Sequence, residues 1–171
     1  MAIGRNMGTL EFLSEQIYLP GYMAVREADL CSKRGDFLFD VKEPRVTRGD
    51  IVNYFTPRGL HICVSQAGYT LMEHLAGKEL LGDLDVNTLR KILLQGRGKI
   101  TELYQKFRKE VELTRPLSGT FDITQMRLGK TPVMKMDFEF GSRKVEGYLT
   151  LIIAPSPTPQ LNQDILRFQI K

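Results

Sequence analysis

Residues 59–77 read Gly59-Leu-His-Ile-Cys-Val-Ser-Gln-Ala-Gly-Tyr-Thr-Leu-Met-Glu-His-Leu-Ala-Gly77 and carry the clearest structural signal in the chain. The run is long enough for about five turns of α-helix, and its apolar residues leave almost no wholly polar face. A helix that is apolar nearly all round is buried on most sides. The run therefore predicts a long central helix. Gly68 is a poor helix former, and we expect it to let a neighbouring sheet approach this helix closely.

A column of polar residues interrupts this apolar helix. Side chains four residues apart stack on one helix face, and a polar side chain on a buried helix must find a partner. The column is therefore either a structural network or a functional site. Its members are His61, Ser65, Tyr69 and Glu73, with Gln66 and Thr70 beside them.

Length and composition indicate one compact domain over residues 1–171. The chain has 171 residues and 42% hydrophobic content, which is enough for a core of ordinary size. Its two cysteines, Cys31 and Cys63, lack the spacing of a disulfide framework or a metal site. We therefore expect a reducing, cytoplasmic setting. His61 and His74 have no ligand-type neighbours at metal-site spacing, so no metal is expected.

The charge pattern argues against several classes of partner. The net charge is +4, the basic residues are scattered, and the chain has no tryptophan. Nucleic-acid binding is not expected from such a pattern, whereas an acidic partner such as a phosphorylated cofactor or a carrier protein is compatible with it. No run of the sequence approaches the ~20 apolar residues of a membrane helix, and no signal segment is evident at the start.

The rest of the chain divides into helices first and strands later. A short N-terminal helix is predicted over residues 9–19, before Pro20, and a strand over 37–41. A helical insertion is predicted near residues 84–105, with a helix over 86–95 and further turns over 100–104. Alternating apolar residues then predict strands over 111–114, 120–124 and 134–140, followed by an apolar strand over 148–153 and a last short strand within 165–170. Short connections favour an antiparallel meander, and the fold class is α+β.

Three short motifs resemble those of the FcoT-like hot-dog fold thioesterase family, which acts on long-chain fatty acyl-CoA. Cys63-Val-Ser-Gln-Ala-Gly-Tyr69 resembles the central-helix motif Cys-x-Asn-Gln-x-x-Tyr. Thr114-Arg-Pro-Leu-Ser-Gly-Thr-Phe121 is similar to Arg-Lys-Pro-Leu-x-x-x-x-Phe, and Glu146-Gly-Tyr-Leu-Thr-Leu151 to Gly-Glu-Ile-Glu-Leu. The resemblance covers roughly residues 18–154. It implies the hot-dog fold, in which an antiparallel sheet wraps around a long central helix.

The resemblance also implies a set of catalytic residues. The family's set is two tyrosines and two asparagines. The tyrosines match Tyr22 and Tyr54, and the asparagine of the helix motif falls on Ser65, which can donate and accept one hydrogen bond. The second asparagine has no clear match, and His61 occupies the nearby position. Gln66 is expected to help position water or substrate.

Substrate binding is expected around the start of the central helix. Hot-dog enzymes usually place the thioester carbonyl there, where free backbone N–H groups stabilise an oxyanion. Gly59 and Leu60 would supply those groups, and Tyr69 and Met72 would contact the substrate, Met72 in an apolar channel for the acyl tail. The resemblance further implies a homodimer or a dimer of dimers. No cofactor is expected.

Three functions stay open from the sequence. The first is hydrolysis of fatty acyl-CoA or acyl carrier protein thioesters. The second is dehydration of a 3-hydroxyacyl thioester, which in hot-dog dehydratases uses a histidine and a helix carboxylate; here Ser65 and Gln66 stand where the acid is expected. The third is non-catalytic binding of acyl-CoA or acyl carrier protein. A serine hydrolase is not expected, because Ser65 lacks the strand-to-helix elbow of such enzymes.

Overall fold

The protein is described by a computed structural model that covers residues 7–18, 24–41, 54–113 and 116–154. Helices come mainly from the first half of these residues and strands from the second. The elements are α1 (Met7–Phe12), the π-helix η1 (Leu13–Ile17), β1 (Val25–Cys31), β2 (Arg34–Phe39), α2 (Pro57–Gly77), α3 (Val86–Leu94), β3 (Gly98–Phe107), β4 (Leu117–Arg127), β5 (Val133–Phe140) and β6 (Val145–Ile153).

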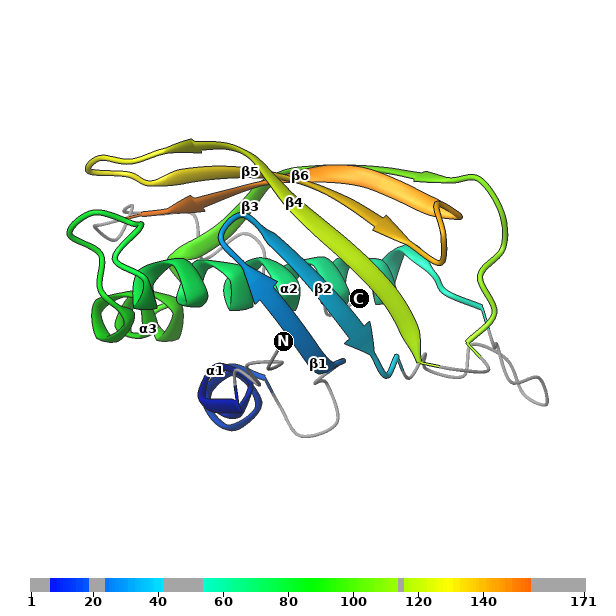
Figure 1. Ribbon diagram of the computed structural model, residues 1–171, viewed down its shortest axis with the longest axis horizontal. Coiled ribbons are helices and arrows are strands. Elements are labelled where there is room, and N and C mark those ends of the chain that lie inside the picture. The colour runs from blue at the N-terminus through cyan, green and yellow to red at the C-terminus, as the bar shows by residue number, and fades with distance from the viewer. Residues whose placement is uncertain (1–6, 19–23, 42–53, 114–115, 155–171) are drawn as a thin grey trace, which may run out of the picture.

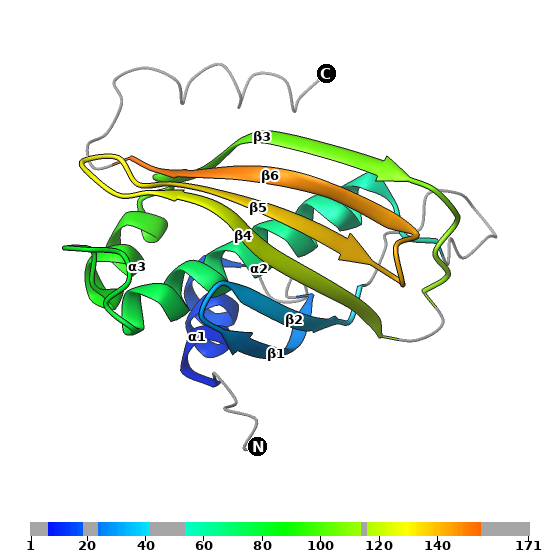
Figure 2. The same ribbon diagram turned by 45° about the horizontal axis from the view of Figure 1, so that its top comes forward.

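One antiparallel sheet curves around the long helix α2. Its strand order is β1-β2-β4-β5-β6-β3. Figure 1 shows the sheet above α2, with β1 and β2 crossing in front of the helix, and Figure 2 shows α2 running along the concave side of β3 to β6. This arrangement confirms the predicted α+β class and the predicted central helix.

Local sequence signals set the start of α2 and its distance from the sheet. Thr56 caps the helix, because its hydroxyl accepts a hydrogen bond from the N–H of Gly59, and Pro57 occupies the first turn. Gly68 lies where the sheet comes closest. A Cβ atom at this position would stand 2.6 Å from Leu151 Cδ1 and 3.2 Å from Met136 Cε. The close approach predicted from Gly68 is therefore confirmed.

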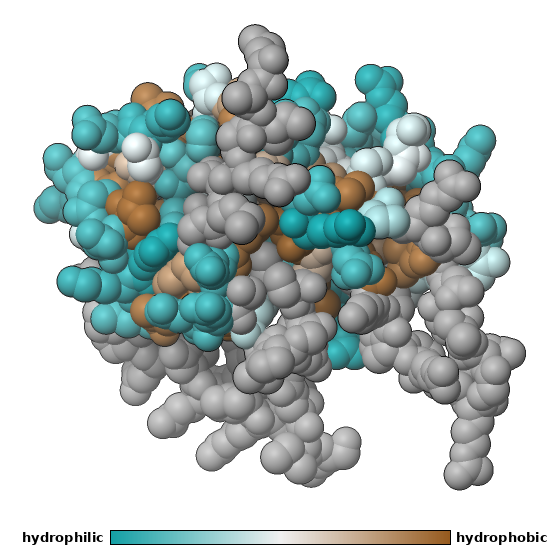
Figure 3. Space-filling model, turned by 60° about the horizontal axis from the view of Figure 1, so that its bottom comes forward, coloured by the Kyte–Doolittle hydropathy of each residue, from teal (hydrophilic) through white to brown (hydrophobic). Residues whose placement is uncertain are grey.

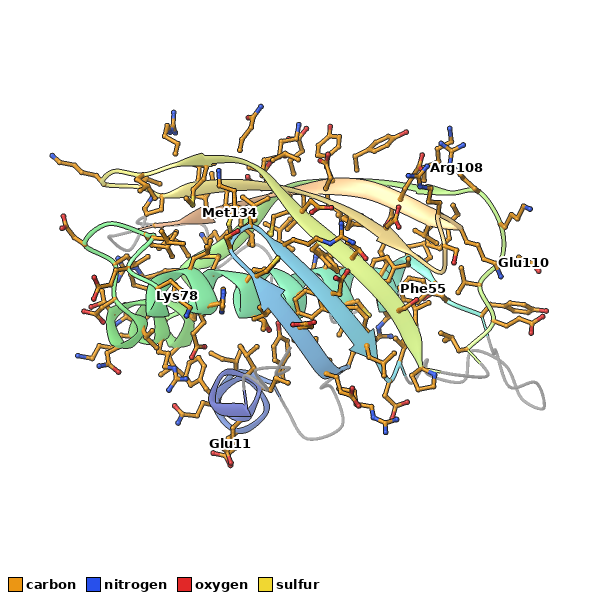
Figure 4. All side chains as sticks on the ribbon, viewed as in Figure 1. Glu11, Phe55, Lys78, Arg108, Glu110 and Met134 are labelled. Atoms are coloured by element: carbon orange, nitrogen blue, oxygen red, sulfur yellow. The ribbon has the colours of Figure 1, made fainter. Side chains whose placement is uncertain are left out.

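A cluster of phenylalanines fills the space between α2 and the sheet. Neighbouring rings in this cluster have centroids 5.2–6.3 Å apart, which is the range of favourable aromatic contact. Figure 4 shows Met134 and Phe55 between the sheet and α2, whereas Arg108 lies on the outer side of the sheet. The rings belong to Phe37, Phe39, Phe55, Phe121, Phe138 and Phe140.

The predicted helical turns over residues 100–104 are wrong, because this segment lies inside strand β3. The predicted helix over 86–95 is present as α3, and the chain turns directly from it into the strand. The register between β3 and β6 shifts between Ile100 and Glu102. Such a bulge inserts one residue and breaks the period of two. The apolar residues Ile100 and Leu103 are therefore three apart, which is a helical spacing.

Other sequence predictions have mixed outcomes. The N-terminal helix is present as α1 and η1, and the strands over 37–41, 120–124, 134–140 and 148–153 correspond to β2, β4, β5 and β6. The predicted strand over 111–114 is not formed over its described residues 111–113, which make only an isolated bridge between Glu112 and Tyr54. Strand β1 was not predicted. The predicted strand within 165–170 lies outside the described residues.

The face opposite the sheet carries hydrophilic residues with separate hydrophobic patches between them (Figure 3). Among the described elements, no helix is both long enough and apolar enough to span a membrane. The described elements share one hydrophobic core, to which both helices and strands contribute.

Candidate functional site

A pocket of about 440 Å³, here called the α2 pocket, lies between α2 and the segments that precede β1 and β3. One wall comes from α2 and the other from the end of η1, the end of α3 and the start of β3. Its described lining residues are Gln16, Ile17, Tyr18, His61, Ile62, Ser65, Tyr69, Leu93, Leu94, Gly96 and Gly98.

Helical spacing places the polar column of α2 at this pocket. His61, Ser65 and Tyr69 are four residues apart, and all three line it. Glu73, one turn further, does not line the pocket, because its carboxylate is buried and pairs with the guanidinium of Arg90. Part of the polar column predicted from the sequence therefore lines the pocket, and its last residue, Glu73, belongs to a structural ion pair.

The hydroxyl of Ser65 is fixed by its own helix. Its Oγ donates a hydrogen bond to the carbonyl oxygen of His61, at 2.7 Å, one turn earlier. The side chain is 8% exposed and borders the pocket. With its proton committed, the hydroxyl oxygen can still accept a hydrogen bond from water or a ligand. The imidazole of His61 is exposed at the same wall.

Two tyrosines contribute neutral phenols to the pocket. The hydroxyl of Tyr69 donates to the carbonyl oxygen of Gly98 at 3.1 Å, which ties α2 to the start of β3. Burial raises the pKa of Tyr69. Burial, and secondarily the neighbouring Tyr69, raises the pKa of Tyr18 well above its ordinary value. Both phenols therefore keep their protons at physiological pH and can act as hydrogen-bond donors.

Sequence reasoning did not identify Tyr18 or the second wall formed by Leu93, Leu94 and Gly98. Tyr18 follows directly after the N-terminal helix, and nothing in its local pattern shows which way its ring points. The second wall depends on how the end of α3 packs against α2. No periodicity in residues 93–98 signals that packing, so only the tertiary structure reveals these residues.

Gln66 lies in the core rather than at the α2 pocket. Its side chain is fully buried, and its Oε1 accepts hydrogen bonds from the backbone N–H groups of Ala24, at 2.8 Å, and Val25, at 3.0 Å. These bonds join the middle of α2 to the start of β1. Since a buried amide needs partners, the contacts give Gln66 a structural role. Its predicted catalytic role stays a prediction.

The residues predicted to bind substrate at the helix start are also placed away from the described lining of the pocket. The N–H groups of Gly59 and Leu60 donate to the side-chain and backbone oxygens of Thr56, respectively. Leu60 and Met72 are buried in the core. An oxyanion would have to displace the Thr56 contacts to reach those N–H groups. The predicted substrate contacts of Gly59, Leu60 and Met72 remain predictions.

Tyr54, one of the two tyrosines suggested by the family resemblance, is not among the described lining residues of the α2 pocket. Tyr54 is 45% exposed and bridges to Glu112 just before α2. Tyr22 lies outside the described residues. Their catalytic roles stay predictions. Within the described ranges, no group of three or more His, Cys, Asp or Glu side chains has the arrangement of a metal site.

Comparison of the structure with known proteins identifies the fold. No protein-family model matches the sequence, and no curated protein matches it either. A candidate thioesterase from Shewanella oneidensis superimposes with a TM-score of 0.56 at 8% identity, over 87% of this chain and 96% of its own. A thioesterase from Pseudomonas aeruginosa, in a glutamine-to-alanine variant, gives 0.53 at 11% identity, over 88% and 95%.

A candidate thioesterase from Syntrophus aciditrophicus is similar to the same extent, with a TM-score of 0.52 at 13% identity, over 86% of this chain and 96% of its own. The three structures cover 86–88% of the chain. At such low identities the likeness establishes the fold. The chain has the hot-dog fold, as the sequence predicted.

Proposed function

We propose that the protein hydrolyses acyl thioesters of coenzyme A or of an acyl carrier protein at the α2 pocket. The observation that carries the proposal is the meeting of His61, Ser65 and Tyr69 on one wall of a pocket whose other residues are largely apolar. Polar groups on one wall can handle the thioester, while the apolar side chains contact the acyl group. The hot-dog fold, shared with candidate thioesterases, supports the same function.

The reaction needs a base, a held water molecule and a donor to the carbonyl oxygen. His61 is the proposed base, and the oxygen of Ser65 would accept a hydrogen bond from the water and hold it beside the imidazole. The water oxygen bonds to the thioester carbon as His61 takes its proton. The carbon–sulfur bond then breaks, and the proton passes to the leaving thiolate, which gives a free acid and a thiol.

Tyr18 is the proposed donor to the carbonyl oxygen. Its phenol stays protonated because burial raises its pKa, and its hydroxyl makes no hydrogen bond to another described residue. Negative charge develops on the carbonyl oxygen as water attacks, so a donor placed there stabilises the transition state more than the substrate. Tyr69, which already donates to Gly98, would hold the second wall in place.

We also propose that the protein is related to the FcoT-like family and that it forms a homodimer. Ser65 and Tyr69 of the resembling motif border the pocket. Within the described residues, β3 pairs only with β6, so its other edge is free, and Gly98 at its start lines the pocket. A second copy at this edge would cover Leu94, which is 50% exposed at the pocket. A cytoplasmic location fits such an enzyme.

Dehydration is less well supported. The described lining of the α2 pocket contains no aspartate or glutamate. The nearest carboxylate on the polar column, Glu73, is held by Arg90. A hot-dog dehydratase would need an acid beside the histidine, so the geometry favours hydrolysis.

The experiment is release of free thiol from a panel of acyl-CoA and acyl carrier protein substrates of increasing chain length. We expect release that depends on acyl length and falls by about 100-fold in His61→Gln, as for loss of a general base. His74→Gln is the matched control, because His74 is the other histidine of the chain and does not line the pocket. Ser65→Ala and Tyr18→Phe should lower the rate constant, and Tyr54→Phe tests the role implied by resemblance.

No release from any substrate would refute hydrolysis. If acyl-CoA still raised the melting temperature, a binding protein without catalysis would become the better description. Equal losses in His61→Gln and His74→Gln would show that the effect does not come from the α2 pocket.

A further inference from the structure

A second pocket, of about 720 Å³, lies at the end of the molecule where α3 faces the hairpin between β4 and β5. We call it the hairpin pocket. Figures 1 and 2 both show α3 and this hairpin at the same end. Its lining and that of the α2 pocket have no residue in common. The aliphatic part of the lining comes from Leu81, Leu84, Ile92, Leu128 and Ile153.

Cations outnumber anions around this aliphatic surface. Lys91, Arg97 and Lys130 line the pocket, and Asp83 is the one carboxylate among its described lining residues. Leu128, at the hairpin turn, is 46% exposed beside them. The pocket therefore presents an excess of positive charge next to an apolar surface, which suits a ligand with a negative head and an aliphatic chain.

Arg97 is held in place by neutral acceptors. Its Nε donates to the carbonyl oxygen of Ala154 at 2.8 Å, and its Nη1 donates to Oε1 of Gln95 at 2.6 Å. No carboxylate of the described residues pairs with it, in contrast to Arg90, which pairs with Glu73. The guanidinium is thus oriented while its charge is not neutralised within the described part of the chain.

The position of Gln95 shows where an anion can bind. Its side chain is exposed and lines the pocket. Its oxygen accepts a hydrogen bond from Nη1 of the Arg97 guanidinium. The adjacent Nη2 is buried and has no hydrogen-bond partner among the described residues. A carboxylate that replaced the oxygen of Gln95 could use Nη1 and Nη2 together, which is the bidentate arrangement that arginine favours.

We infer that the hairpin pocket binds a free fatty acid, with its carboxylate on Arg97 and its chain along Leu81, Ile92 and Leu128. None of the described lining residues is aromatic, so nothing there is suited to stack on a nucleotide base. Lys91 and Lys130 add attraction for the head group without a fixed geometry. This site is distinct from the α2 pocket and does not depend on the proposed hydrolysis.

Calorimetric titration of the full chain with decanoate tests the inference. We expect saturable binding of decanoate, and binding of decanol roughly tenfold weaker, since decanol lacks the charge that pairs with Arg97. Decyl phosphate distinguishes the two sources of an anionic head group. Much tighter binding of decyl phosphate than of decanoate would overturn the fatty-acid assignment in favour of a phosphate ligand.

Variants locate the binding. Arg97→Gln and Leu128→Glu should each weaken decanoate binding roughly tenfold, and Arg97→Gln should leave decanol binding unchanged. Leu128 is at an exposed turn, so Leu128→Glu keeps the test valid if Arg97→Gln does not fold. Lys144→Gln, an exposed cation on the turn between β5 and β6, is the matched control and should have no effect.

A variant of the other pocket separates the two sites. Ile62 lines the α2 pocket and is not among the described lining residues of the hairpin pocket. Loss of decanoate binding in Ile62→Gln, together with full binding in Arg97→Gln and Leu128→Glu, would overturn the inference and assign the ligand to the α2 pocket. Failure of thiol release would refute the proposed hydrolysis alone, because decanoate binding is measured without catalysis.

Discussion

The side-chain oxygen of Gln66 accepts a hydrogen bond from the backbone N–H of Ala24, 2.8 Å away, although 42 residues separate them in the chain. The N–H of Val25 donates to the same oxygen at 3.0 Å. One fully buried amide therefore joins the central helix to the first strand. This contact decides how substitutions at Gln66 should be interpreted, because loss of activity there can follow from loss of structure.

Replacing Gln66 with methionine should destabilise the protein by about 3 kcal/mol, because two buried N–H groups would lose their acceptor. Urea unfolding measures the change. Gln66→Glu keeps an acceptor for both N–H groups but buries a charge, so it should also be destabilised. If Gln66→Met unfolded at the wild-type urea concentration yet released no thiol, Gln66 would act in catalysis rather than in holding β1.

The ion pair between Glu73 and Arg90 gives a second prediction. Glu73 is 3% exposed, Arg90 donates from Nε to its carboxylate at 2.8 Å, and the guanidinium lies 4.6 Å from the centre of the Phe12 ring. Arg90→Met would leave a buried carboxylate without this partner and should cost about 3 kcal/mol in unfolding experiments. The double variant Glu73→Leu with Arg90→Met should recover much of that loss. Equal stability of the single and double variants would contradict this account.

A register shift can hide part of a strand from sequence periodicity, although β4 also has one, between Ile123 and Gln125, and was predicted up to residue 124. Strands β5 and β6 alternate or are apolar throughout, and the sequence predicted both. Strands β1 and β3 each contain a register shift, between Val25 and Glu27 and between Ile100 and Glu102. One extra residue moves the following side chains to the opposite phase of the alternation. In β3 periodicity alone then indicates a helical spacing. In β1 the shift lies at the start and residues 27–31 still alternate, so it does not explain why this strand was not predicted.

The candidate site was predictable on one side only. Helical periodicity depends on the sequence of α2 alone, so the spacing of Ser65 and Tyr69 is enough to place them on one face. Tyr18 and Gly98 reach the same pocket through packing between segments far apart in the chain. Hydrogen-bond capacity does not decide the role of Gln66, because an amide beside a polar column can equally serve a catalytic or a structural purpose.

Gly147 gives a third prediction, which concerns the edge of the sheet. A Cβ atom there would lie 2.0 Å from the backbone oxygen of Tyr104, the residue before Gln105, with which Gly147 pairs across the β3–β6 ladder. A backbone atom in a ladder cannot move aside as a side chain can, so Gly147→Ala should cost more than about 2 kcal/mol, at the upper end of overpacking. Amide hydrogen exchange should show the largest loss of protection in β3.

The matched control for Gly147 is Gly77, at the end of α2. Among the described residues, a Cβ atom there meets only Val86 Cγ2, at 3.6 Å, which is an ordinary contact. Gly77→Ala should therefore leave stability unchanged or raise it slightly, because alanine is the better helix former. Similar destabilisation of both variants would show that the Tyr104 contact is not the cause.

Alkaline pH should destabilise the protein through Tyr18. Burial raises the pKa of this phenol in the folded state above its ordinary value of 10.0. Below pH 10 the phenol of Tyr18 is protonated in both the folded and the unfolded chain, so its contribution to the free energy of unfolding is fully present. As pH rises above 10, the unfolded chain loses the proton first and stability falls. Urea unfolding between pH 9 and 11 should therefore show a smaller decline for Tyr18→Phe than for the wild type. Tyr54→Phe, at an exposed tyrosine, is the control, and an equal change in both variants would contradict the assignment to Tyr18.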